Sequence, residues 1–259
     1  MIVLGLTGGM RQGKSTVGEL LRGLAGVDYK ADLETSYPIS EVANNWISSW
    51  PVLPTTTNRE ELISLANGLI ESLPKSLELV TGKLADPAKL KIGDSPASHE
   101  EHKQLIKYLE LWTGLTAQER DAQLPLPITA ENKVMHRPLL MWLGGGMIEL
   151  VAPTIWCDLL DRRIKQLGDR GYSLVTVGGI RYPQDARMIA SNFGFVVRVV
   201  RPDTERSNNI TETVMQELHP DVVIYNDDSL NSLEKTCQML WTDLKNGNLQ
   251  THYRASHLA

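Results

Sequence analysis

The residues with the clearest chemistry lie close to the N-terminus, in the segment GLTGGMRQGKST. Gly8, Gly13, Lys14 and Ser15 have the spacing G-x-x-x-x-G-K-S. Glycines at both ends allow a short loop to turn tightly, so that its backbone N–H groups point at phosphate oxygens. The lysine adds a positive charge, and the serine adds a hydroxyl for Mg²⁺. The segment therefore predicts a loop that binds the phosphates of ATP, with contacts from Gly8, Gly9, Gln12, Gly13, Lys14 (also catalytic), Ser15 (also a metal ligand) and Thr16.

The segments on either side of this loop match the setting that a phosphate-binding loop needs. Before it, residues 2–4 form a short apolar run that predicts a buried strand. After it, Val17, Leu20, Leu21 and Leu24 recur at helical spacing, and the N-terminal dipole of such a helix attracts phosphate. The spacing arises by chance on the order of once in a hundred chains of this length. A glycine-rich turn with a surface lysine is the alternative.

Charged and polar side chains also follow the other apolar runs that predict strands, which occupy residues 27–31, 172–179, 195–200 and 221–226. In a parallel sheet the ligand lies at the carboxyl ends of the strands. Phosphoryl transfer needs cations around the moving phosphoryl group and a group that orients the acceptor oxygen. We therefore interpret Arg181 and Arg201 as catalytic cations, and Asp32 as a catalytic carboxylate.

Each of these residues has a structural alternative. Arg181 and Arg201 could be ordinary surface residues, and a loop aspartate such as Asp32 often only caps or turns the chain. Asp227 and Asp228 directly precede the last predicted helix, in the run NDDSL. This position favours a role as helix caps over a contact with ligand.

Strands that alternate with helices predict an α/β fold, with a parallel sheet covered by helices on both faces. We expect one domain over residues 1–245, with a helical and loop insertion at about 57–136. The stretch 82–104, GKLADPAKLKIGDSPASHEEHKQ, is polar and broken by prolines and glycines. It predicts an exposed insertion or a flexible arm. The polar tail, 246–259, is expected to be loosely held.

Composition narrows the classes of function. The 259 residues carry a formal charge of −5 at pH 7, which gives no support for nucleic-acid binding, and six scattered histidines lack metal-ligand spacing. No apolar run approaches the roughly 20 residues of a membrane-spanning helix, and the chain starts without the charged region of a signal peptide. Cys157 and Cys237 lie on apolar faces of predicted helices, as expected of buried, reduced thiols. We therefore expect a cytoplasmic protein that acts on small molecules.

Three segments of the C-terminal half resemble the phage-type deoxynucleoside monophosphate (dNMP) kinases. They are RPLLMWLGGGMIELVAPTIWCDLL, VTVGGIRYPQDARMIASNFGFVVRVVRP and NNITETVMQELHPDVVIYNDDSLNSLEK. The resemblance also covers the phosphate loop. It implies a P-loop kinase-like fold and transfer of the γ-phosphoryl group of ATP, with Mg²⁺, onto a dNMP, in the host cytoplasm if the chain is phage-encoded. The residues that match are Arg137, Arg181 with Tyr182, Arg201 with Pro202, and Asn226; for dNMP binding the resemblance implies Arg137 and Glu212.

The sequence departs from this family's pattern in several places. Gly179 stands where the family has an aspartate at the end of a strand, and Asp185 replaces a glutamate. If the missing aspartate helps to hold Mg²⁺, Ser15 and the phosphates carry more of that task. The lid signature is replaced by Asn209–Glu212 and lacks its histidine. Reduced or altered activity would follow.

Two other interpretations stay open. The N-terminus also resembles dephospho-CoA kinase, whose chain starts with an apolar strand and a GLTGG loop, and Asp32 then matches that family's catalytic aspartate. Alternatively, the chain is a non-catalytic nucleotide-binding or assembly protein on a degenerate kinase fold. Gly179 is the main support for this alternative, whereas the intact Lys14 and Ser15 argue against it. The sequence leaves open the accepted base, the role of residues 57–136 and the oligomeric state, a homodimer included.

Overall fold

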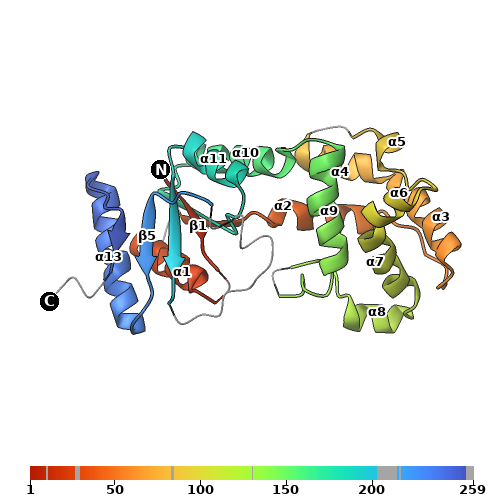
Figure 1. Cartoon of the computed structure of the whole chain (residues 1–259), viewed down its shortest axis with the longest axis horizontal. Coiled ribbons are helices and arrows are strands. Elements are labelled where there is room, and N and C mark those ends of the chain that lie inside the picture. The colour runs from red at the N-terminus through yellow and green to blue at the C-terminus, as the bar shows by residue number, and fades with distance from the viewer. Residues whose placement is uncertain are drawn as a thin grey trace. The chain divides into compact units, whose positions relative to one another are not determined.

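The computed structural model describes residues 1–9, 11–26, 30–82, 85–129, 131–202, 215 and 217–254. The chain forms two compact units (Figure 1). The first unit combines Met1–Thr35 with Leu160–Ala259, and the second is Ser36–Leu159. The second unit takes in more of the chain than the insertion predicted at 57–136.

The first unit contains a six-stranded sheet in which every pair of neighbouring strands is parallel. The order across the sheet is β2-β3-β1-β4-β5-β6. The strands are β1 (Ile2–Thr7), β2 (Lys30–Glu34), β3 (Leu174–Gly178), β4 (Phe195–Val200), β5 (Val222–Tyr225) and β6 (His252–Tyr253). The central strands are rich in Val, Ile and Leu because both faces of a parallel sheet are covered. The predicted α/β fold with a parallel, P-loop kinase-like sheet is confirmed.

One face of this sheet is covered by α1 (Lys14–Leu24) and α13 (Leu230–Asn246), which pack against each other (Figure 1). Leu4 and Leu6 of β1 are buried in an apolar core shared with both helices. The helix predicted from the apolar spacing after the loop is therefore present as α1. Its apolar side chains pack on the sheet, and its N-terminus lies at the loop.

The opposite face is covered by α11 (Pro183–Ser191), which packs on β1 and β4. At Gly5 of β1, this helix lies close to the strand: a Cβ added there would lie 2.7 Å from the side chain of Ile189 in α11. Helix α10 (Ile155–Asp169) leads the chain from the second unit back into the first. Helices on both faces were predicted and are confirmed.

The second strand lies later in the chain than the run at 27–31 predicts. It is β2, at Lys30–Glu34, and residues 27–29 lie outside the described residues. Asp32 is therefore in the middle of the strand and not after it, while Glu34 is its last residue. The pattern misleads because β2, with the sequence KADLE, has charged side chains at alternate positions where a buried strand usually has apolar ones.

The chain after α13, expected to be loose, forms an edge strand. His252–Tyr253 is β6, which pairs with β5. Tyr253 is buried, and its hydroxyl donates to Asp243 Oδ2 of α13 at 2.9 Å while it accepts from the backbone N–H of Gln250 at 2.9 Å. A buried tyrosine with both bonds holds this segment on the sheet. Residues 255–259 lie outside the described part of the chain.

The second unit is helical and has an aromatic core. Trp46 stacks on Trp142, with ring centroids 5.6 Å apart, and Trp50 meets Trp46 edge-on at 5.2 Å. Its helices are α2 (Tyr37–Ser48), α3 (Arg59–Ile70), α4 (Leu73–Thr81), α5 (Pro87–Leu90), α6 (Pro96–Glu101), α7 (Lys103–Thr113), α8 (Ala117–Gln123) and α9 (Arg137–Leu150). Across the described ranges of both units, no helix is long and apolar enough to cross a membrane.

The segment around α5, predicted as an exposed or flexible arm, is packed. Ala85, Leu90 and Ile92 are buried in the core of the second unit. Asp86 starts α5 by accepting a hydrogen bond from the backbone N–H of Ala88 at 3.0 Å. Three apolar side chains spaced among polar residues give no periodic signal, so the sequence did not indicate this packing.

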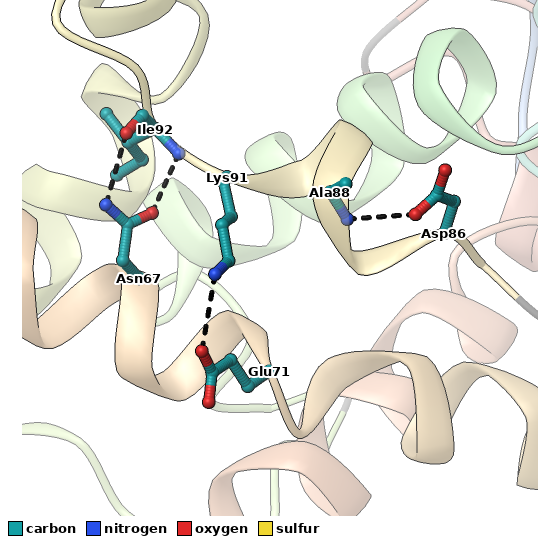
Figure 2. A network of polar contacts seen from close by, with 6 residues as sticks. All are labelled: Asn67, Glu71, Asp86, Ala88, Lys91 and Ile92. Atoms are coloured by element: carbon teal, nitrogen blue, oxygen red, sulfur yellow. Dashed lines mark hydrogen bonds and ion pairs between the residues drawn. The ribbon is translucent and has the colours of Figure 1, made fainter.

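Figure 2 shows how α3 holds this segment. Asn67 Nδ2 donates to the carbonyl of Ile92 at 3.1 Å, and Asn67 Oδ1 accepts from the N–H of Ile92 at 2.8 Å. Lys91 and Glu71 add an exposed ion pair of 3.4 Å beside it. The paired bonds to Ile92 replace those that a helix or sheet would supply to its backbone.

Candidate functional site

The loop between β1 and α1 has a backbone that favours glycine at two positions. Gly8 has a φ of 136° and Gly13 a φ of 95°, values that side chains rarely allow. A Cβ at Gly8 would lie 2.4 Å from the carbonyl oxygen of Val199, and one at Gly13 would lie 2.5 Å from Asn226 Nδ2. A side chain at either position would therefore move the loop or its neighbours. The two glycines of the motif are required by the shape of this turn.

Two side chains of the loop bond back to its own backbone. Lys14 Nζ donates to the carbonyl oxygens of Gly8 and Gly9, both at 2.7 Å. Gln12 Oε1 accepts from the N–H of Gly9 at 2.7 Å. These bonds hold the ammonium group against the loop, where phosphate oxygens could take the place of the carbonyls.

A cavity of about 510 Å³ opens at the start of α1. Arg11, Lys14 and Arg201 line it, and Asp228 is the one acidic residue among the described residues of the lining. The positive end of the α1 dipole adds to this charge. The other lining residues are Gly13, Ser15, Thr16, Asn226, Leu230 and Leu233. The cavity therefore suits an anion with several charged oxygens, such as a polyphosphate.

Asn226, the residue after β5, braces the loop. Its Nδ2 donates to the carbonyl of Gln12 at 3.0 Å, and its own N–H donates to the carbonyl of Val200 at 2.8 Å. The sequence marked Asn226 as a polar residue at the end of a predicted strand and as a match to the kinase pattern. Its contact with a loop more than two hundred positions earlier could not be read from local spacing.

Asp227 and Asp228 do not cap α13, contrary to the interpretation of NDDSL. The cap is Ser229, whose side chain accepts from the N–H of Ser232 at 3.3 Å. Asp227 instead forms an ion pair with Arg254 after β6, and Asp228 lines the cavity. Serine is as good a cap as aspartate, so the sequence alone could not choose between neighbours.

Asp32 has structural partners at its position in β2. Its Oδ1 accepts from Arg22 Nη1 at 2.7 Å and from Thr176 Oγ1 at 2.8 Å. Arg22 Nη1 also donates to Thr176 Oγ1 at 2.7 Å. These bonds tie α1 to β2 and β3. Because the Asp32 side chain is 45% exposed, the ion pair itself adds little stability.

Arg181 follows β3 at the predicted edge of the sheet, and its side chain is exposed. Its backbone N–H donates to Asp185 Oδ2 at 2.9 Å, as does that of Tyr182 at 3.0 Å. Asp185, which stands where the dNMP kinases have a glutamate, is therefore buried in the first turn of α11, where its side chain bonds back to the backbone of the N-cap residue Tyr182. Of the residues predicted to be catalytic, Lys14 and Arg201 line the cavity, whereas Arg181 and Asp32 are not among its lining residues in the described part of the chain.

The backbone conformation after β3 favours glycine at the position where the dNMP kinases have an aspartate. Gly179 has a φ of 77°, so a non-glycine residue there would be strained. The nearest carboxylate to this glycine is that of Glu34, the last residue of β2, whose Oε2 would lie 3.2 Å from a Cβ at Gly179. The sequence indicated Glu34 as a carboxylate at the end of the second strand, but this contact crosses strands and could not be read from local spacing.

The remaining predicted residues lie elsewhere. Arg137 is the exposed first residue of α9 in the second unit, and Glu212, with the altered lid signature, lies outside the described residues. Among the described residues, no group of three or more His, Cys, Asp or Glu could hold a metal ion. Mg²⁺ normally binds phosphate oxygens together with one or two protein oxygens, so the hydroxyl of Ser15 fits that role.

The loop, the N-terminus of α1 and the basic cavity together form a candidate anion site at the carboxyl edge of a parallel sheet, and its charge suits a polyphosphate. A scan against models of known protein families finds no match for this chain, and a search of curated proteins finds none either.

Proposed function

We propose that this chain is a Mg²⁺-dependent kinase that transfers the γ-phosphoryl group of ATP to a dNMP. The observation that carries the proposal is the loop, in which Gly8 and Gly13 adopt positive φ and Lys14 sits over the carbonyls beside a basic cavity. A loop of this kind, followed by a helix N-terminus, directs N–H groups and positive charge at phosphate.

The donor side of the reaction uses residues of the first unit. Lys14 exchanges its two carbonyl acceptors for phosphate oxygens, which are stronger acceptors because they are charged. Ser15 and the phosphates would hold Mg²⁺, and the bound ion would neutralise charge on the phosphates. Arg201, in the same cavity, stabilises the charge of the phosphoryl group during transfer.

The acceptor side rests on the resemblance to the dNMP kinases. Arg181, Arg201 and Asn226 follow three strands of one sheet in the order that this family shows. Arginine binds a phosphate dianion in a bidentate manner, so exposed arginines at this edge suit an acceptor that carries one. We assign Arg137 and Glu212 to the binding of the dNMP on the resemblance alone.

Dephospho-CoA kinase is the weaker alternative. Its main support, Asp32, bonds to Arg22 and Thr176 inside the first unit. The non-catalytic alternative draws on Gly179, because no acid stands at that position.

An acceptor panel tests the proposal. ATP consumption in Mg²⁺ is measured with each dNMP, each ribonucleoside monophosphate, modified dNMPs and dephospho-CoA. At least one dNMP is expected to raise turnover far above the background ATPase rate, because only a correctly held acceptor lies in line with the γ-phosphate. Turnover with dephospho-CoA alone, or ATP binding with no turnover for any acceptor, would contradict it.

We also propose that the reaction takes place in the cytoplasm. Cys157 and Cys237 are buried and form no disulfide, as is usual in a reducing compartment.

A further inference from the structure

A carboxylate occupies the space beside the end of β3. Glu34 of β2 pairs with Gly178, the last residue of β3. A Cβ at Gly178 would lie 2.2 Å from Glu34 Oε1 and 2.8 Å from its Cδ. At Gly179, a Cβ would lie 2.6 Å from Thr35 Oγ1. The Gly178–Gly179 pair thus leaves room for the Glu34 side chain and for the residue that follows it.

The backbone after Glu34 is fixed to the end of β3. The N–H of Thr35 donates to the carbonyl of Gly178 at 3.1 Å, and Thr35 Oγ1 donates to the carbonyl of Gly179 at 3.1 Å. Glu34 is half-buried. The backbone that carries its side chain is therefore held in place, which favours a group that orients a ligand.

Glu34 lies on the face of the sheet that α1 covers. Side chains alternate along a strand, so Glu34 shares a face with Asp32, which contacts Arg22 of α1. Two strand residues advance about 6.6 Å, and one helical turn advances about 5.4 Å. Arg22 Nη1, which bonds Asp32 at 2.7 Å, would lie 3.0 Å from a Cβ at Gly18, so Asp32 lies beside Gly18. Because α1 starts at the carboxyl edge and runs back along the sheet, Glu34 lies about one helical turn from Gly18, towards the first turn of α1, which holds Ser15.

We propose that Glu34 supplies, from β2, the carboxylate beside Mg²⁺–ATP that Gly179 at the end of β3 does not supply. This inference rests on the proposed function. Mg²⁺ takes oxygen ligands and is usually held by one or two carboxylates or hydroxyls together with substrate phosphates. Glu34 and Ser15 provide that set of oxygens, directly or through water. The Gly178–Gly179 pair thus makes room for the carboxylate of Glu34 from the neighbouring strand, β2.

Nucleotide binding with and without the metal tests this role independently of turnover. The affinity for a non-hydrolysable ATP analogue is measured by calorimetry in Mg²⁺ and in EDTA. In Glu34→Gln, the gain in affinity that Mg²⁺ gives is expected to fall by about 10- to 100-fold, the usual loss when a group that holds a metal or its ligands is removed. Affinity in EDTA is expected to stay the same. Glu34→Asp, which keeps the charge, is expected to keep part of the gain.

The control is Glu19→Gln, since Glu19 is an exposed glutamate of the same unit on α1. It should bind the analogue like the wild type under both conditions, and thermal unfolding of each variant checks that it is folded. An unchanged Mg²⁺-dependent gain in Glu34→Gln would overturn the inference while leaving the kinase proposal standing, as would equal losses in Mg²⁺ and in EDTA. If the wild type binds no ATP analogue, the proposed function fails and the inference with it. If the Mg²⁺-dependent gain behaves as expected but no acceptor is phosphorylated, the role of Glu34 stands and the kinase activity does not.

Discussion

At the scale of single residues, the loop between β1 and α1 depends on two glycines whose positions leave no room for a side chain and on one lysine whose ammonium group is held by backbone carbonyls. The glycines of α1 differ in this respect from those of the loop. A Cβ at Gly23, on the exposed side of α1, would meet nothing within 4 Å, whereas one at Gly13 would meet Asn226. Replacement by alanine should therefore weaken ATP binding at Gly13 and stabilise the helix at Gly23.

Gly13→Ala is expected to weaken ATP binding by about 5- to 150-fold, because strain of about 1–3 kcal/mol at a positive φ must be relieved by moving the loop. Gly23→Ala is the matched control. It is expected to leave ATP binding unchanged and to stabilise α1 by up to about 1 kcal/mol, since alanine favours a helix. Calorimetric titration and chemical denaturation measure the two effects. Equal ATP affinities in the two variants would contradict the role assigned to the loop backbone.

At the scale of elements, asparagine side chains hold irregular backbone in the second unit. Asn67 of α3 bonds both backbone groups of Ile92. Asn44 of α2 does the same at Ile128, with Nδ2 donating to the carbonyl at 3.1 Å and Oδ1 accepting from the N–H at 2.7 Å. Each amide satisfies a donor and an acceptor that lie outside helices and strands.

Asn67→Ala is expected to lower the free energy of unfolding by about 1–3 kcal/mol, because it leaves the N–H and the carbonyl of buried Ile92 without partners. Asn231→Ala, at an exposed position in α13, is expected to change stability by less than about 0.5 kcal/mol. Urea denaturation followed by circular dichroism gives both values. A loss at Asn67 no larger than at Asn231 would mean that the contact in Figure 2 does not hold the segment.

A buried histidine should make the stability of the second unit depend on pH. His136 Nδ1 lies 2.8 Å from the hydroxyl of Tyr108, and its Nε2 lies 3.0 Å from the carbonyl of Pro125. Burial lowers the pKa of His136 and raises that of Tyr108, so the folded state favours neutral imidazole and a protonated phenol. Below the usual histidine pKa of about 6.5, the unfolded chain then binds more protons than the folded one.

The contribution of neutral His136 to the free energy of unfolding should be fully present above about pH 6.5. It should be lost as pH falls through the lowered pKa of His136 in the folded state. His136→Gln is expected to be less stable than the wild type at neutral pH but to lose less stability on acidification. His99→Gln, on α6, should keep the slope of the wild type. Thermal unfolding between about pH 7 and pH 5 provides the comparison, and parallel curves for wild type and His136→Gln would contradict the assignment.

At the scale of the whole molecule, the sequence predicted what depends on local pattern. β1, the loop and α1 follow from adjacent residues, because the apolar run, the glycines and the helical spacing are each complete within the first 24 positions. The α/β fold with a parallel sheet likewise follows from apolar runs that alternate with helices.

What the sequence missed depends on contacts between distant segments. Asp32 was expected after its strand, but Arg22 and Thr176 bond it within the sheet. The contact of Glu34 with the end of β3 crosses strands separated by well over a hundred positions. A two-residue strand such as β6 is too short to show any periodicity.

Transfer of a labelled γ-phosphoryl group from ATP to a dNMP is the direct measurement of the proposed kinase activity. Wild type, Lys14→Ala and Lys75→Ala, a control at an exposed lysine of α4, are incubated with labelled ATP, Mg²⁺ and each natural or modified dNMP, and the products are separated. For the wild type and for Lys75→Ala, we expect label in the diphosphate of at least one deoxynucleoside. In Lys14→Ala the rate should fall by at least about 100-fold, since a preorganised charge on the phosphates is lost. Label found only in inorganic phosphate or in ATP, for every acceptor tested, would contradict it.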